Sequence, residues 1–522
     1  MRPDFSAADS FVIKSAAAAY CRGNNKEDRT IMTEATSAVY VKKAAVVQTI
    51  AHINVKCDDA VGVLGVSAAA SVRVSETLNG EVRLSGRESV ELTVTTEDGM
   101  RKASGWAEIS DRAEIAGITP QTRAMAACRV TDTDIVSVNG GNIALASVVE
   151  VTIFAEEHSV IPSAPQTEEN IYADSETVHL SRLSARLAGR AESTESEKIQ
   201  MAEVLCCNAG VDMGAPEAAL DSVFAGGRFI LDGVGKTVEG NVVPFTCELP
   251  FSCELPAEGV RRGDTVFMRI GAVSVSESRS ESGVTLSASA ELSGEVYCEM
   301  TAVAVTDAFS PASELKLTRG ELCGMIVSGS YCLTDKAEST VSLPEGENAD
   351  KITSLCGFGL TALSAYADGG KVILEGAVSG YVIYSDAEAG RRSSCNAEIP
   401  FRITTDISAE DNEQPIVDAS VCSVMARSAR RGEIAVSCTM NFRVLCTTEV
   451  CVQPVTGIVR GEGKADRTGV LSMYSASAGE TLWTCAKALS VSPDTLLSQN
   501  PDLEFPLTRR EKVFVFRSGR AG

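Results

Sequence analysis

Long stretches of this chain alternate apolar and polar residues with a period of two. The clearest stretch carries an apolar residue at every second position from 284 to 292, with Thr, Ser and Glu between them. A similar alternation runs from 434 to 444, and a looser one from 143 to 154. Successive side chains of a strand point to opposite faces of its sheet, so the pattern predicts three long strands that each bury one face.

A glycine motif precedes each of these stretches. An apolar-x-Leu-x-Gly segment ends at Gly86, at Gly233 and at Gly376, and these glycines are 147 and 143 residues apart. This spacing is much longer than that of solenoid repeats, so each copy is expected to be a domain of its own. We therefore predict three antiparallel β-domains, of sandwich or barrel-like architecture, in which the three glycines are equivalent.

A second motif supports the repeat and helps to divide the chain. Glu-apolar-Pro-Phe occurs at 248–251 and 398–401, and Trp106 stands at a comparable offset in the first copy. Polar segments rich in Pro or Gly, at 162–170 and 461–466, are expected to be a linker and a flexible tether. The predicted domains are 1–165, 176–315, 320–460 and a small C-terminal domain at 470–518.

The C-terminal segment changes to helical spacing. Leu482, Ala486 and Leu489 recur at intervals of four and three, and Thr481 precedes them at a position typical of a helix N-terminus. Ser492 is followed by Pro493, which predicts the start of a second helix. With an alternating strand on either side, the predicted order is strand, helix, helix, strand.

This segment resembles a LysM module. The residues that match the family pattern are Tyr474, Gly479, Glu480, Thr481, Leu482, Trp483, Ala486, Val491, Ser492, Leu496, Asn500, Leu507 and Val513. Arg510 stands where the family has a turn glycine, and Phe516 where it has a closing proline. The resemblance implies a shallow binding groove between two loops, formed by Gly479, Glu480, Thr481, Leu482, Asn500, Pro501, Asp502 and Leu503.

Together, the tandem repeats and the LysM-like end resemble the SPOCS-domain spore-envelope proteins of endospore formers, over most of residues 50–518. The resemblance implies a non-enzymatic structural adaptor in spore coat morphogenesis. It also implies a location in the mother-cell cytoplasm at the forespore surface. The implied partner is the basement-layer protein of the coat, a SpoIVA-like ATPase, engaged through the LysM end. The alternatives are a cell-envelope protein whose LysM binds peptidoglycan, an N-acetylglucosamine-containing glycan, and a cell-wall hydrolase with a LysM tail.

Charge and composition narrow the classes of partner. The formal net charge is −23, which disfavours nucleic acid and anionic membrane surfaces as partners. A hydrophobic content of 44% predicts a globular chain. No run of 18 apolar residues occurs, so no transmembrane segment is expected. Asp4, Asp9 and Lys14 argue against a signal peptide, and residues 14–20 are expected to form an alanine-rich helix.

Cysteine spacing argues against a metal or disulfide framework. The chain has 17 cysteines but no Cys-x-x-Cys, and its three histidines, His52, His158 and His179, are far apart. Several cysteines fall at apolar positions of predicted strands, where a reduced thiol packs as a small hydrophobe. We therefore predict free thiols and a reducing compartment.

Familiar catalytic motifs are missing. Residues 231–237 imitate a phosphate-binding loop, but Ile230 stands where the first glycine belongs. The sequence contains neither His-Glu-x-x-His nor Gly-x-Ser-x-Gly. The 70 acidic residues offer many carboxylate pairs, and nothing distinguishes one of them. We expect no enzymatic activity, no cofactor and no metal.

Overall fold

The computed structural model describes residues 35–97, 99–162, 170–280, 283–345, 347–386, 391–430, 432–464 and 471–517. Within these ranges the chain is mainly β, as predicted, and its two helices are α1 (Leu482–Leu489) and α2 (Pro493–Gln499). The helix predicted at 14–20 and most of the linker predicted at 162–170 lie outside the described residues. No helix in the described ranges has the length and apolarity needed to span a bilayer.

Six long strands, arranged as two antiparallel sheets, recur three times along the chain. The first strand pairs with the sixth and the sixth with the fifth, while the second, third and fourth form the other sheet. Sandwich 1 consists of β1 (Ala35–Lys56), β2 (Gly62–Leu78), β3 (Glu81–Thr96), β4 (Gly99–Glu114), β5 (Ala124–Asn139) and β6 (Asn142–Pro162).

The other two units repeat this arrangement. Sandwich 2 consists of β7 (Tyr172–Glu192), β9 (Glu203–Met213), β11 (Ser222–Lys236), β12 (Val242–Pro256), β13 (Thr265–Ser280) and β14 (Gly283–Phe309), with the short strands β8 (Glu197–Ile199) and β10 (Glu217–Ala218). Sandwich 3 consists of β16 (Leu322–Ser342), β17 (Lys351–Asp368), β18 (Lys371–Asp386), β19 (Arg391–Ser408), β20 (Gln414–Ser428) and β21 (Glu433–Val452). In each unit, buried residues of both sheets form a common core.

The repeated glycine lies in the central strand of the second sheet. Gly86 is directly opposite Ile109 on the fourth strand, and Gly376 is opposite Phe401. A Cβ atom at either glycine would lie 2.2 Å from a carbonyl oxygen of the second strand, Ser71 O or Ala362 O. Real Cβ atoms do not approach backbone this closely, so both positions require glycine.

In sandwich 2 the equivalent glycine is Gly227, and the prediction of Gly233 was wrong. Gly227 is opposite Phe251 of the Leu-Pro-Phe motif, and its Cβ would lie 2.3 Å from Asp212 O. Gly233 lies six residues further along the same strand, opposite Phe245. The prediction failed because Ala225 takes the place of the motif's leucine, so the motif matched a later segment of the strand.

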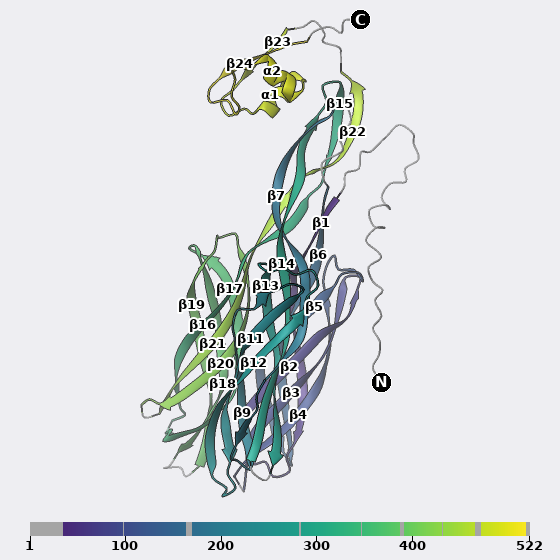
Figure 1. Cartoon of the computed structure of the whole chain (residues 1–522). Helices are drawn as coiled ribbons and strands as arrows, with labels where there is room; N and C mark the ends of the chain where they lie inside the picture. Colours follow the sequence, from purple (N-terminus) through teal and green to yellow (C-terminus); the bar gives the residue numbers. More distant parts are fainter. Residues whose placement is uncertain are drawn as a thin grey trace.

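The three sandwiches pack side by side in one bundle (Figure 1). The last hairpin of each sandwich contacts the second strand of another, and the contacts run from sandwich 1 to 3, from 3 to 2 and from 2 to 1. The three contacts are Arg129 Nη2 to Leu363 O (3.4 Å), Asn441 Nδ2 to Met213 O (3.2 Å), and Ser71 Oγ to Glu291 Oε2 (3.1 Å). Because the contacts close a ring, the three units form one body.

Long strands extend from the bundle and carry the C-terminal residues (Figure 1). The ends of β7 and β14 pack with β15 (Ser313–Arg319) and β22 (Val455–Gly463) around buried apolar residues, and we call this part the stalk. The predicted flexible tether was therefore wrong for residues 461–463, which belong to β22. Residues 465 and 466 lie outside the described ranges.

Beyond the stalk lies the C-terminal module. It contains β23 (Leu471–Ala476), α1, α2 and β24 (Glu511–Phe516), and its two strands pair in an antiparallel sheet. Its core includes Ala486, Leu496 and Val513, all fully buried. Residues 471–517 therefore form a small unit around a hydrophobic core, to which Phe309 of β14 also belongs.

One core position of sandwich 1 is occupied by a carboxylic acid. Glu88 is two residues after Gly86, where the other sandwiches have the buried Phe229 and Val378. Glu88 is 0% exposed, and neither carboxyl oxygen has a hydrogen-bond partner in the described part of the chain. Burial raises the pKa of Glu88, against a smaller opposing effect of Ser147. The carboxyl group of Glu88 therefore binds its proton more tightly in the folded chain than in the unfolded chain.

Replacing Glu88 with leucine is expected to stabilise the chain by about 1–3 kcal/mol at neutral pH, the usual cost of an unsatisfied buried polar group. A raised folded-state pKa means that wild-type stability falls as pH rises from the unfolded value through the folded value. The gain from Glu88→Leu should therefore be larger at pH 8 than at pH 5.5 in thermal melts. Glu88→Gln should remove the same pH dependence, and a gain that does not change with pH would contradict the assignment.

Candidate functional site

Both helices of the C-terminal module begin at side chains that cap them. Thr481 Oγ1 accepts a hydrogen bond from the Thr484 N–H (3.2 Å), and Thr484 Oγ1 accepts one from the Thr481 N–H (3.0 Å). Ser492 Oγ accepts from the Thr495 N–H (3.0 Å) at the start of α2, where Pro493 occupies the first helical position. These caps satisfy free N–H groups and fix the loops that lead into the helices.

The first predicted loop is held by its own polar groups. Gly479 has a φ of +89°, and its N–H donates to Leu507 O (2.7 Å). Glu480 accepts a hydrogen bond from the Ser477 N–H (2.9 Å), and this bond is the main cause that lowers the pKa of Glu480. Leu482 packs against the module's core. Of this loop, Thr481 and Gly479 are the exposed residues.

The second predicted loop contains a structural amide. The buried Asn500 donates through Nδ2 to Leu496 O (2.9 Å) and Phe514 O (2.7 Å), and its Oδ1 accepts from the Phe514 N–H (3.0 Å). It thus ties the end of α2 to β24. Leu503 is half-buried, whereas Pro501 and Asp502 are exposed. Glu480 and Asn500, although predicted to contact a ligand, are occupied in holding the module together.

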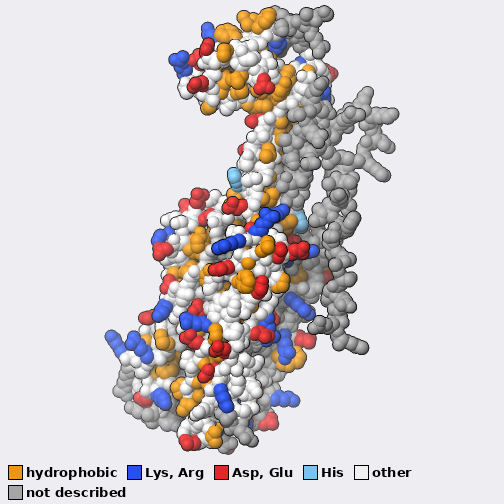
Figure 2. Space-filling model, in the orientation of Figure 1, with side chains coloured by type: hydrophobic (Ala, Val, Ile, Leu, Met, Phe, Trp, Pro, Cys, Tyr) orange, Lys and Arg blue, Asp and Glu red, His pale blue; other side chains and the backbone are white. Residues whose placement is uncertain are grey.

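The module also carries an apolar surface that was not predicted from the sequence. Leu471 lies opposite Phe516 in the β23–β24 ladder, and Met473 lies opposite Phe514, so the four side chains share one face. They are 64%, 53%, 57% and 41% exposed, respectively. We call these four residues the outer sheet face. Val513 and Val515 are buried on the opposite face of the sheet, and Figure 2 shows hydrophobic side chains gathered on the surface of the module.

The module differs in charge from the rest of the chain. Residues 471–517 contain five basic and five acidic side chains, while the whole chain carries −23. The exposed Lys512 lies next to the outer sheet face, opposite Ser475, and Arg510 Nε donates to Ser475 Oγ (3.1 Å). The outer sheet face is therefore bordered by basic groups.

The module is fixed to the stalk through α1. Trp483 Nε1 donates to Asp307 Oδ2 (3.0 Å), Lys487 forms an ion pair with the same carboxylate, and the Trp483 ring meets Phe309 edge-on with centroids 4.9 Å apart. Burial alone would raise the pKa of Asp307, but the bonds from Lys487 and Trp483 hold it below its ordinary value. These contacts orient the module relative to the stalk.

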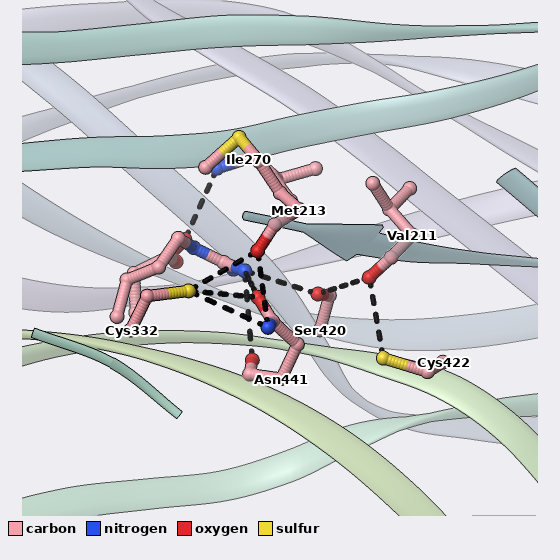
Figure 3. Close-up of polar contacts among 9 residues, drawn as sticks. Val211, Met213, Ile270, Cys332, Ser420, Cys422 and Asn441 are labelled. Carbon is pink, nitrogen blue, oxygen red and sulfur yellow. Dashed lines mark hydrogen bonds and ion pairs between the residues drawn. The ribbon is translucent and has the colours of Figure 1, made fainter. Parts of the chain in front are cut away.

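A buried polar network joins sandwich 3 to sandwich 2 (Figure 3). The side chain of Arg443, only 2% exposed, donates to Asp418 Oδ2 (2.7 Å) and to Asn441 Oδ1 (2.7 Å). Asp418 in turn accepts from the Ile270 N–H (3.0 Å), and Ser420 Oγ donates to Val211 O (2.9 Å). The groups that this network contacts in sandwich 2 belong to the backbone, so the network has a structural role.

A cavity of about 400 Å³ lies where the three sandwiches meet. Among its lining residues, Lys102 forms ion pairs with Glu91 (2.9 Å) and Glu277 (3.1 Å). Burial raises the pKa of Asp232 to about 6, with a smaller opposing effect of Asn208. The cavity is polar, and the charged groups of Lys102, Glu91 and Glu277 pair with one another.

The cysteines in the described ranges follow the prediction, with the exception of one pair. Fourteen of these cysteines have free thiols, and burial raises the pKa of most of them, as expected for packed side chains. Cys323 and Cys451, however, are joined in a disulfide. The prediction was wrong for this pair because strand register places them directly opposite each other, although they are 128 residues apart.

Neither a family model, nor a curated protein, nor a solved structure matches this chain.

Proposed function

We propose that this chain is a non-enzymatic structural adaptor in spore-envelope assembly, which docks through its C-terminal module to an anchor protein at the forespore surface. The observation that carries the docking role is the outer sheet face. Four large apolar side chains lie exposed on one side of a module that projects beyond the bundle on the stalk (Figure 1). Exposed apolar groups clustered in this way are characteristic of interaction sites.

The composition of the face fits a protein partner. Phe514 and Phe516 are aromatic residues of the kind that contribute most binding energy when they enter a pocket on a partner. Met473 adds a flexible side chain that adapts to irregular surfaces. The basic groups beside the face, Lys512 and Arg510, would allow an acidic rim on the partner. The bundle, which carries the negative charge, would be repelled by the same rim.

The identity of the anchor rests on the sequence resemblance alone. The resemblance to SPOCS-domain proteins with a LysM end points to a SpoIVA-like basement-layer ATPase of the coat, in the mother-cell cytoplasm. The three-sandwich bundle then provides a broad surface for further coat components. Glycan binding at the predicted loops is the competing function, and its exposed candidate residues are Gly479, Thr481, Pro501 and Asp502.

Phe516→Glu is expected to weaken binding of the full-length chain to the purified anchor protein about thirtyfold, because truncating or charging a central contact costs about 2 kcal/mol or more. In sporulating cells a fluorescent fusion of this variant should leave the forespore surface. Biolayer interferometry and microscopy measure the two effects.

Leu497→Glu is the matched control. Leu497 lies on α2 of the same module, is 46% exposed, and does not belong to the outer sheet face. It should bind as the wild type does. Equal losses in both variants would contradict docking through the face. Binding of the chain to peptidoglycan sacculi that falls with Asp502→Ala but not with Phe516→Glu would favour the glycan function instead.

A further inference from the structure

Two short chain segments connect sandwich 3 to the stalk. Residues 320–321 lead from β15 into β16, and residues 453–454 lead from β21 into β22. The two segments run together, because the Gly320 N–H donates to Pro454 O (3.1 Å). This junction fixes how the stalk, and with it the C-terminal module, leaves the bundle.

Three metal-binding side chains gather at the junction. Cys323 and Cys451 are directly opposite each other on β16 and β21, with Cα atoms 4.1 Å apart. Glu321 is two residues before Cys323, which is the spacing that places side chains on one face of a strand. Its carboxylate and the two sulfur atoms all lie within 4.8 Å of one another. Among the described residues, no other three Cys, His, Asp or Glu side chains come this close.

We infer that, once the disulfide is reduced, Glu321, Cys323 and Cys451 bind one thiophilic divalent cation, with Zn²⁺ as the best fit. Two thiolates and a carboxylate are ligands that Zn²⁺ accepts in tetrahedral sites. Zinc–sulfur bonds of about 2.3 Å require sulfur atoms about 3.8 Å apart in such a site. Opposite residues of an antiparallel ladder, with Cβ atoms about 4.5–5.5 Å apart, can meet this requirement by side-chain rotation.

Exposure supports the inference. Glu321 and Cys451 are exposed and Cys323 is half-buried, so an ion can enter and water can take the fourth position. Cys422 and Cys438 show the contrast, because both are buried in packed sheets and burial raises their pKa, which disfavours the thiolate. The pair at the junction is therefore placed to exchange with ions and reductants in solution.

A dithiol reductant supplies the electrons that are needed to open the disulfide. The reductant transfers two electrons and two protons to the Cys323–Cys451 disulfide and is itself converted to a cyclic disulfide. Zn²⁺ then displaces the two thiol protons, which pass to the buffer, so binding strengthens as pH rises. The disulfide joins only β16 to β21. The cation would also hold Glu321, which belongs to the junction segment, and would thereby stiffen the base of the stalk.

The test uses the full-length chain, reduced with dithiothreitol, freed of reductant without oxygen, and titrated with Zn²⁺ against a chromogenic chelator. We expect one tightly bound Zn²⁺ per reduced chain and none at this site in the oxidised chain. Cys451→Ser should abolish this binding, and Glu321→Gln should weaken it at least tenfold. Co²⁺ in place of Zn²⁺ should give a thiolate-to-metal absorption band that both variants lose or diminish.

Cys298→Ser is the control, since Cys298 is a half-buried free thiol on β14 and is not part of the group. It should bind one Zn²⁺ as the wild type does. Glu321 is exposed, so Glu321→Gln should keep the wild-type melting temperature, and loss of the fold cannot account for its weaker binding. The inference is overturned if the reduced wild type binds no Zn²⁺, or if Cys451→Ser and Glu321→Gln bind it as tightly as the wild type.

Discussion

Replacing Arg443 with methionine should lower the free energy of unfolding by about 3–5 kcal/mol, the usual result of breaking a buried ion pair. Methionine fills a similar volume but leaves Asp418 and Asn441 without the donor that joins them. Because Asp418 also holds the Ile270 N–H of sandwich 2, the loss extends across the contact between sandwiches. Urea titration followed by circular dichroism measures the change.

Arg228→Met provides the comparison, because Arg228 also forms ion pairs, with Asp212 and Glu248, both at 3.0 Å. Its side chain is 50% exposed, against 2% for Arg443. Water screens the exposed pairs, so this variant should lose no more than about 1 kcal/mol. If the two variants lost equal stability, burial of the Arg443 network would not be what holds sandwich 3 to sandwich 2.

The period of two identified the strands well, because burial on one face of a sheet is a local property. All five apolar residues predicted to face inward between 284 and 292 are buried in β14. The caps at Thr481 and Ser492 could equally be predicted from the sequence, since a capping side chain and the N–H groups that it satisfies lie within one turn. In both cases the interacting groups are neighbours in the sequence.

The packing of the three sandwiches could not be predicted in this way. In the network of Figure 3, the partners in sandwich 2 are the carbonyl groups of Val211 and Met213 and the N–H of Ile270, and every residue type except proline supplies both groups. The Cys323–Cys451 pair depends on the register between the first and last strands of sandwich 3, which no local pattern specifies. The sequence motifs indicated the repeat of a long unit, but they did not indicate the ring that the three units form.

The candidate site shows the same division. The resemblance pointed to the loops around Glu480 and Asn500, yet both side chains have structural partners. The sequence does contain a signal for the outer sheet face, because Val513, Phe514, Val515 and Phe516 place apolar side chains on both faces of one strand. A strand of a small two-stranded sheet cannot bury both faces within the module, so one face of this strand was bound to be exposed.

Gly210→Ala should cost about 3 kcal/mol of stability, at the upper end of the usual range for overpacking. A Cβ atom at Gly210 would lie 1.9 Å from the carbonyl oxygen of Cys422 and 2.5 Å from its carbonyl carbon, across the contact between sandwiches 2 and 3. Both clashing atoms are backbone, so no change of rotamer relieves the overlap and the two sandwiches must separate. Separation would also break the bond from Ser420 to Val211.

Gly359→Ala is the matched substitution, since a Cβ at Gly359 would meet nothing within 4 Å and the residue lines the same central cavity. It should be neutral, or slightly stabilising because alanine restricts the unfolded chain. If the three sandwiches were independent domains joined only by linkers, Gly210→Ala would be as harmless as Gly359→Ala. A lower urea midpoint for Gly210→Ala alone, with faster hydrogen exchange in β9 and β20, is the result expected if sandwich 3 packs against sandwich 2 and covers Gly210.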